Sequence, residues 1–131
     1  MHVTPFYAAL LVLVFLRLSM RTIKLRRQLK IAIGAGGNPT MHRAMRVHGN
    51  FAEYVPLSLL LIFLFELQGA HFLLIHLFGA CLLLGRLAHA HGVSREKEDY
   101  RYRVYGMLMT FTVLAGSAVG VLVLYVVELI G

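Results

Sequence analysis

The sequence has few of the residues that stabilise a small secreted domain or solubilise a large enzyme. It has one cysteine, Cys81, in 131 residues, and only six acidic side chains. A single cysteine excludes a domain held together by disulfides. Charged residues make up 15% of the chain and hydrophobic residues 59%, whereas soluble domains average about 25% and about 45–50%. This composition excludes a disordered tail and a large soluble enzyme, and it favours one membrane domain over residues 1–131.

Four mainly apolar stretches contain no Asp, Glu, Lys or Arg: Met1–Leu16, Tyr54–Phe65, Leu67–Gly85 and Val104–Val127. A membrane-spanning helix needs roughly 20 mainly apolar residues, so we predict four such helices, over residues 3–30, 42–67, 70–91 and 102–129. The first is a helix rather than a cleaved signal peptide, because no basic residue precedes it and a basic run follows it. The predicted fold is an all-α membrane protein, a bundle of four transmembrane helices, with Thr40 as a candidate N-cap of the second helix.

The basic residues fall into two groups around the first and third connections. The first group is Arg17, Arg21, Lys24, Arg26, Arg27, Lys30, Arg43 and Arg46; the second is Arg86, Arg95, Lys97, Arg101 and Arg103. With four spans these connections share one side of the membrane, and the positive-inside rule predicts that this side is cytoplasmic and both termini lie outside. This distribution explains the net charge of +7 better than a nucleic-acid partner does, and some of these residues could simply contact anionic headgroups.

A polar face begins the second predicted helix. At about 100° per residue, five hydrogen-bonding side chains share a sector about 100° wide: Arg43, Arg46, Asn50, Glu53 and Tyr54. Such a stripe cannot face lipid, because an ionised group in hydrocarbon costs several kcal/mol. It either forms a buried structural network or lines a site for a ligand with carboxylates and an amine. Ionisable groups within membrane helices favour the ligand site.

The same segment carries a family resemblance. Residues 46–56 read RVHGNFAEYVP, and the pattern Arg-x-x-x-Asn-x-x-Glu-Tyr-x-Pro resembles the second-helix signature of the MAPEG family, the membrane-associated proteins of eicosanoid and glutathione metabolism. The resemblance extends over essentially the whole chain, with four spans, a basic first loop and an arginine near the start of the fourth helix. The small bacterial inner-membrane members are the most similar. The resemblance implies a homotrimer in the inner membrane.

The resemblance also implies that glutathione binds between neighbouring subunits near the cytoplasmic side. The positions that match the family's glutathione contacts on the second helix are Arg46, Asn50, Glu53 and Tyr54. Arg26 or Arg27 matches a basic residue that holds a glutathione carboxylate. An arginine that opens the fourth helix activates the thiol; Arg103 is our first choice and Arg101 the alternative. At the end of the third helix this chain has His89 and His91, where family enzymes often carry tyrosines.

The implied chemistry agrees with the residue types. Arginine can bind a carboxylate bidentately, and Glu53 suits the ammonium group of glutathione. A thiol with a pKa of about 8.5 is mostly protonated at neutral pH, and a nearby guanidinium favours the nucleophilic thiolate. A lipophilic electrophile would arrive from the bilayer. We therefore expect a glutathione-dependent transferase or peroxidase that brings the two reactants together.

Two other functions stay open. One is a non-catalytic membrane protein of the same family. The other is a small four-helix, proton-coupled exporter, which needs a carboxylate near the middle of the bilayer; Glu66 and Glu128 lie near the outer face instead. No metal site is predicted, because His89 and His91 point in divergent directions on a helix, and Cys81 is expected to be a core residue. The small residues Gly116 and Gly120 allow one face of the last helix to pack tightly.

Overall fold

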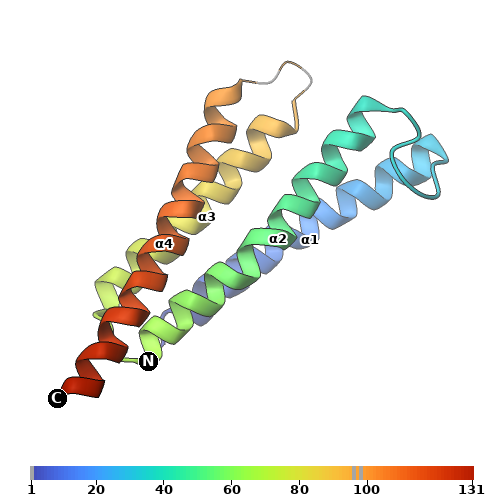
Figure 1. The fold of residues 1–131 in the computed structure, drawn as a ribbon. Helices are drawn as coiled ribbons and strands as arrows, with labels where there is room; N and C mark the ends of the chain where they lie inside the picture. The colour runs from blue at the N-terminus through green and yellow to red at the C-terminus, as the bar shows by residue number, and fades with distance from the viewer. Residues whose placement is uncertain (1, 96, 98) are drawn as a thin grey trace.

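The computed structural model describes residues 2–95, 97 and 99–131. It contains four helices: α1 (Thr4–Leu29), α2 (Pro39–Leu67), α3 (Phe72–Val93) and α4 (Tyr100–Ile130) (Figure 1). Each helix is long and apolar enough to cross a membrane. The four predicted spans are thus confirmed, and their observed ends differ from the predicted ones by at most three residues.

Side-chain caps explain where three of the helices begin. The Oδ1 atom of Asn38 accepts a hydrogen bond from the backbone N–H of Met41 at 3.0 Å. The N-cap of α2 is therefore Asn38 and not Thr40, because Pro39 already fits the first helical position, where no N–H is needed. His71 caps α3 and Asp99 caps α4 in the same way.

The first turn of α1 is held from another helix. The carboxylate of Glu66, at the end of α2, accepts hydrogen bonds from the backbone N–H groups of Val3 and Thr4, the latter at 3.0 Å. These amides have no partner within their own helix, and a negative charge is favourable at a helix N-terminus. Glu66 therefore anchors the beginning of α1 to the end of α2.

The helices form two pairs, α1 with α2 and α3 with α4, which diverge toward one end of the bundle (Figure 1). Both termini lie at the opposite end, next to the short connection between α2 and α3. The first and third connections therefore share one end, as expected for four successive spans.

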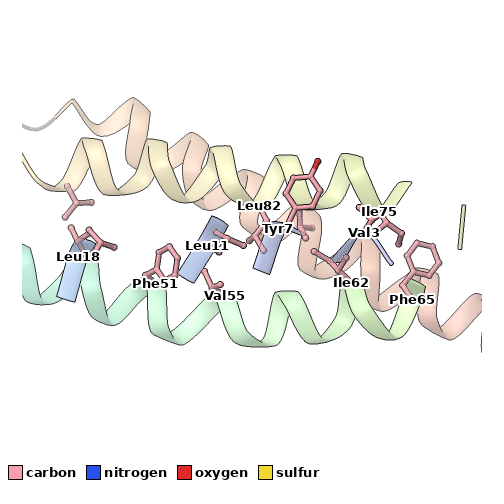
Figure 2. Packing of buried hydrophobic residues seen from close by; sticks show 13 residues of the cluster. Val3, Tyr7, Leu11, Leu18, Phe51, Val55, Ile62, Phe65, Ile75 and Leu82 are labelled. Carbon is pink, nitrogen blue, oxygen red and sulfur yellow. The ribbon is translucent and has the colours of Figure 1, made fainter. Parts of the chain in front are cut away.

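An apolar core joins the pairs along their closely packed part. Figure 2 shows the side chains of Phe51, Val55 and Ile62 on α2 in a row with Leu11 of α1 and Leu82 of α3. All five are at most 4% exposed. By contrast, in the most apolar segment of each helix at most a third of the residues are buried. The remaining apolar surface is the area that a lipid bilayer would cover.

Small residues bring α3 and α4 into close contact. A Cβ atom added to Gly106 would lie 2.5 Å from the carbonyl oxygen of Gly85 and 2.8 Å from the backbone nitrogen of His89. Toward the other end of α4, Gly116 and Gly120 pack against the rings of Phe78 and Phe65. The tight packing predicted for the α4 face that carries Gly116 and Gly120 is confirmed, and its partners are aromatic rings.

Candidate functional site

A polar cavity of about 570 Å³ lies at the end of the bundle where the two helix pairs diverge. The first loop, α2, α3 and α4 all contribute to its wall. The lining residues are Ala35, Gly37, Asn38, Pro39, His42, Arg43, Arg46, Asn50, His89, Val93 and Arg103. Because segments distant in sequence meet here, the cavity exists only in the folded bundle.

The loop that closes one side of the cavity is shaped by glycines and by Arg26. Gly34, Gly36 and Gly37 have φ values of +67°, +56° and +71°, a region that residues with a Cβ atom rarely adopt. The guanidinium of Arg26 donates to the carbonyl oxygen of Gly34 at 3.0 Å and, at longer distances, to those of Ile31 and Ala32. Arg26 therefore holds the loop in its folded-back conformation.

Two further arginines attach α1 and α2 to the end of α3. Arg43 donates from Nη1 to the carbonyl oxygen of Val93 at 3.3 Å. Arg21 donates to the hydroxyl of Ser94 and, at 3.3 Å, to the carbonyl oxygen of the same residue. Cations are favourable at a helix C-terminus, where carbonyl groups lack helical partners. These contacts fix the distance between the two helix pairs on one side of the cavity.

The cavity is strongly basic. Arg43, Arg46 and Arg103 line it together with His42 and His89, and the described lining residues include no acidic side chain. Guanidinium groups bind carboxylates in a bidentate geometry. The cavity is therefore suited to a small ligand that carries carboxylate groups.

Three of the predicted site residues meet in this cavity. Arg46 and Asn50 come from α2 and Arg103 from the first turn of α4, whereas Arg101 does not line it. Between the two arginines that the sequence left open, the geometry therefore favours Arg103. Of the two, only Arg103 lines the same cavity as Arg46 and Asn50.

Glu53 and Tyr54 lie one turn further along α2 and do not line the cavity. Glu53 is exposed on the surface of the subunit. The ring of Tyr54 packs edge-on against Phe111 of α4, with 5.5 Å between centroids. Arg46 is also exposed, and no ion pair joins it to Glu53 in the described part of the chain. Within the described subunit, Arg46 and Glu53 are therefore not paired in a buried network, whereas Asn50 of the same face contacts the buried Arg86.

Arg26 and Arg27 line a separate surface hollow of about 400 Å³ at the end of α1, together with Lys30. Within one subunit the structure therefore does not bring them to the cavity that holds Arg46 and Arg103. This separation depends on where α1 lies in the fold, which the spacing of residues along the chain does not show.

Arg86 is an exception to the prediction that every basic side chain faces one surface of the membrane. It was grouped with the third connection, but its side chain is only 1% exposed. It donates to Oδ1 of Asn50 at 2.7 Å, to the carbonyl oxygen of Gly106 at 3.5 Å and to the sulfur of Met107 at 3.3 Å. Arg86 lies seven residues before the last residue of α3. It is therefore about 10 Å inside the helix, too far from the helix end to reach the membrane surface with the other basic residues. That depth was the signal in the sequence that could have identified it.

The role of His89 was left undecided by the sequence. It follows Arg86 by three residues, so both occupy the same face of α3; it is 5% exposed and lines the cavity. His91 is exposed, and its ring lies edge-on to Tyr102 with 5.2 Å between centroids. The predicted divergence of the two histidines is thus confirmed.

Comparison with protein families matches residues 4–123 to the MAPEG family. The chain belongs to the MAPEG family. The MAPEG protein is also similar to inner membrane protein YecN of Escherichia coli strain K12, with 36% identity over 112 residues, which cover 86% of this chain and 84% of that relative. The protein of the same name from E. coli O6:H1 matches to the same extent. The family membership inferred from residues 46–56 is therefore confirmed.

Proposed function

We propose that this MAPEG protein is a membrane-bound glutathione-dependent transferase or peroxidase. It activates the glutathione thiol for attack on a lipophilic electrophile. The observation that carries the proposal is the basic cavity in which Arg46, Asn50 and Arg103 meet, in a chain whose family is named for glutathione metabolism.

The residues of the cavity support distinct steps. Arg46 and Asn50 bind glutathione oxygens, which fixes the tripeptide against α2. Arg103 lies across the cavity on α4, where its guanidinium stabilises the thiolate and so increases the fraction of nucleophile at neutral pH. The electrophile enters from the bilayer and meets a thiolate that is already positioned. No side-chain nucleophile is required.

The exposed charges on α2 support a homotrimer. Glu53 lies 14 residues before the end of α2, or about 21 Å from it, so it falls within the ~30 Å hydrocarbon core. An exposed carboxylate at this depth needs cover from another chain or from a polar ligand. In the proposed trimer, Arg26 or Arg27 of the partner subunit holds a glutathione carboxylate, and Glu53 and Tyr54 complete the site between subunits.

The proposed location is a bacterial inner membrane, as the name of the similar E. coli protein states for that protein. The basic loops face the cytoplasm and both termini lie outside, following the positive-inside rule. This orientation opens the cavity toward the compartment that supplies glutathione, while the lipid supplies the electrophile.

The proposal is tested with purified protein in detergent. Calorimetric titration should detect glutathione binding, and conjugation of glutathione to a generic aromatic halide should exceed the uncatalysed rate. Arg46→Ala and Glu53→Ala should each weaken binding about tenfold, the loss of one charge-assisted contact, while crosslinking still detects the trimer. Arg17→Ala, an exposed arginine on α1, is the matched control.

The outcomes separate the alternatives. Binding without turnover would indicate a non-catalytic member of the family. Unchanged affinity in both the Arg46 and Glu53 variants would refute the site. Proton-driven dye efflux from vesicles, without glutathione binding, would indicate an exporter instead.

A further inference from the structure

We infer that Arg86 is a positioning residue for the glutathione site. It orients the side-chain amide of Asn50 so that the NH₂ group, and not the carbonyl oxygen, faces the cavity. This inference deepens the proposed function and rests on it. It assigns to Asn50 a defined ligand group: a carboxylate or carbonyl oxygen of the tripeptide.

The orientation follows from the chemistry of the two side chains. A guanidinium group only donates hydrogen bonds, so the atom of Asn50 that it contacts at 2.7 Å is the oxygen, Oδ1. The amide is planar, and its NH₂ group therefore lies on the side away from this contact. Asn50 lines the cavity, whereas Arg86 does not. The group that Asn50 presents to a ligand is thus a donor of two hydrogen bonds.

The position of Arg86 is fixed by three helices. The residue belongs to α3, its first partner to α2, and the other two acceptors, the Gly106 carbonyl oxygen and the Met107 sulfur, to α4. At 1% exposure it has no room for another rotamer in the packed bundle. A rigid donor of this kind favours the amide orientation in which the oxygen of Asn50 faces Arg86.

The contacts of Arg86 are not those of a residue selected for stability alone. Its Nε atom is buried without a hydrogen-bond partner, and in the part of the chain that the structure describes no carboxylate forms an ion pair with it. A buried, incompletely paired charge in a membrane helix is costly. Met or Leu would fill the same space without that cost. Neither could supply the hydrogen bond to Asn50, which at 2.7 Å is the shortest of the three that Arg86 makes.

A double-mutant cycle tests whether Arg86 acts through Asn50. The variants are Arg86→Met, Asn50→Ala and the combination, and the measurement is glutathione affinity by calorimetry. We expect Arg86→Met to weaken binding about tenfold in the wild-type background and less than about twofold in the Asn50→Ala background. Arg86→Lys, which keeps a donor, should recover part of the affinity. Asn50→Asp should weaken binding more than Asn50→Ala, because it replaces the cavity-facing NH₂ group with a negatively charged oxygen.

A matched control separates positioning from mere destabilisation. Thr110 is fully buried and donates at 2.8 Å to the carbonyl oxygen of Gly106, one of the acceptors of Arg86. Thr110→Val should lower the thermal unfolding temperature but leave glutathione affinity unchanged. If Arg86→Met weakens binding equally with and without Asn50, or if Thr110→Val weakens it as much, the positioning role is refuted.

The same cycle measured on thermal unfolding needs no ligand. Suppose that the unfolding temperatures show coupling between Arg86 and Asn50, but that the wild-type protein does not bind glutathione. That result would refute the proposed function and still support the orientation of Asn50. Absence of coupling in unfolding would refute the orientation itself, whatever the affinity for glutathione.

Discussion

The close contact between α3 and α4 at Gly106 predicts that adding one methyl group there will lower the free energy of unfolding. In Gly106→Ala the new Cβ atom would lie 2.5 Å from the carbonyl oxygen of Gly85, 2.8 Å from the Cβ of His89 and 2.8 Å from its backbone nitrogen. Two of these three atoms belong to the backbone of α3, so no side-chain rotation relieves the overlap. Ordinary contact begins at 3.4 Å, and the helices would have to separate by about 0.9 Å.

The expected cost follows from that displacement. Overpacking of a well-packed core costs about 1–3 kcal/mol, and the higher helix propensity of alanine returns up to about 1 kcal/mol. We therefore expect Gly106→Ala to lower the free energy of unfolding in detergent by about 1–2 kcal/mol. Because His89 belongs to both the contact and the cavity wall, glutathione affinity should fall as well.

Gly49→Ala is the matched control for this substitution. It is also inside a helix, but its Cβ atom would meet only the Oε1 atom of Glu53, at 3.9 Å. This variant should be as stable as the wild type or slightly more stable, because alanine is the better helix former. Equal unfolding free energies for the Gly106 and Gly49 variants would show that α3 and α4 are not in the contact described.

Two further predictions concern the two ends of the bundle. Glu66→Ala removes the acceptor for the amides of Val3 and Thr4 and should lower the free energy of unfolding by about 1–2 kcal/mol, the value of a lost N-cap; unfolding monitored by circular dichroism checks this, and an unchanged midpoint would contradict it. Arg103→Lys should reduce the rate of glutathione conjugation at neutral pH at least tenfold, whereas Arg101→Lys, outside the cavity, should not; equal rates for the two variants would contradict the role of Arg103.

The number of helices could be predicted from the sequence because hydrophobic length is a strong local signal. Val104–Val127 alone is long enough to span a bilayer, and α4 contains all of it. The polar face of α2 was equally accessible, since a period of about 100° per residue places Arg46 and Asn50 on one side of any helix. Both inferences depend only on residues close together in the chain.

The residues that meet across helices could not be predicted in this way. Arg101 and Arg103 are two positions apart, so they point to different sides of α4, and only the packing of α4 against α2 decides which one faces the cavity. Arg86 was grouped with the basic residues around the third connection, and no local pattern shows its contact with Asn50, which lies 36 positions away. The separation of Arg26 and Arg27 from the cavity likewise depends on where α1 lies in the folded subunit.

In the site proposed between subunits, the charges on α2 also limit the kind of ligand. Arg46 and Glu53 are both exposed, and seven residues of helix place them about 10 Å apart along the axis. A polyanion would be attracted by the first and repelled by the second. Three extended residues span roughly 10 Å, so a tripeptide with a carboxylate near one end and an ammonium near the other matches both the signs and the spacing. Because the two side chains do not neutralise each other, both charges are available to such a ligand.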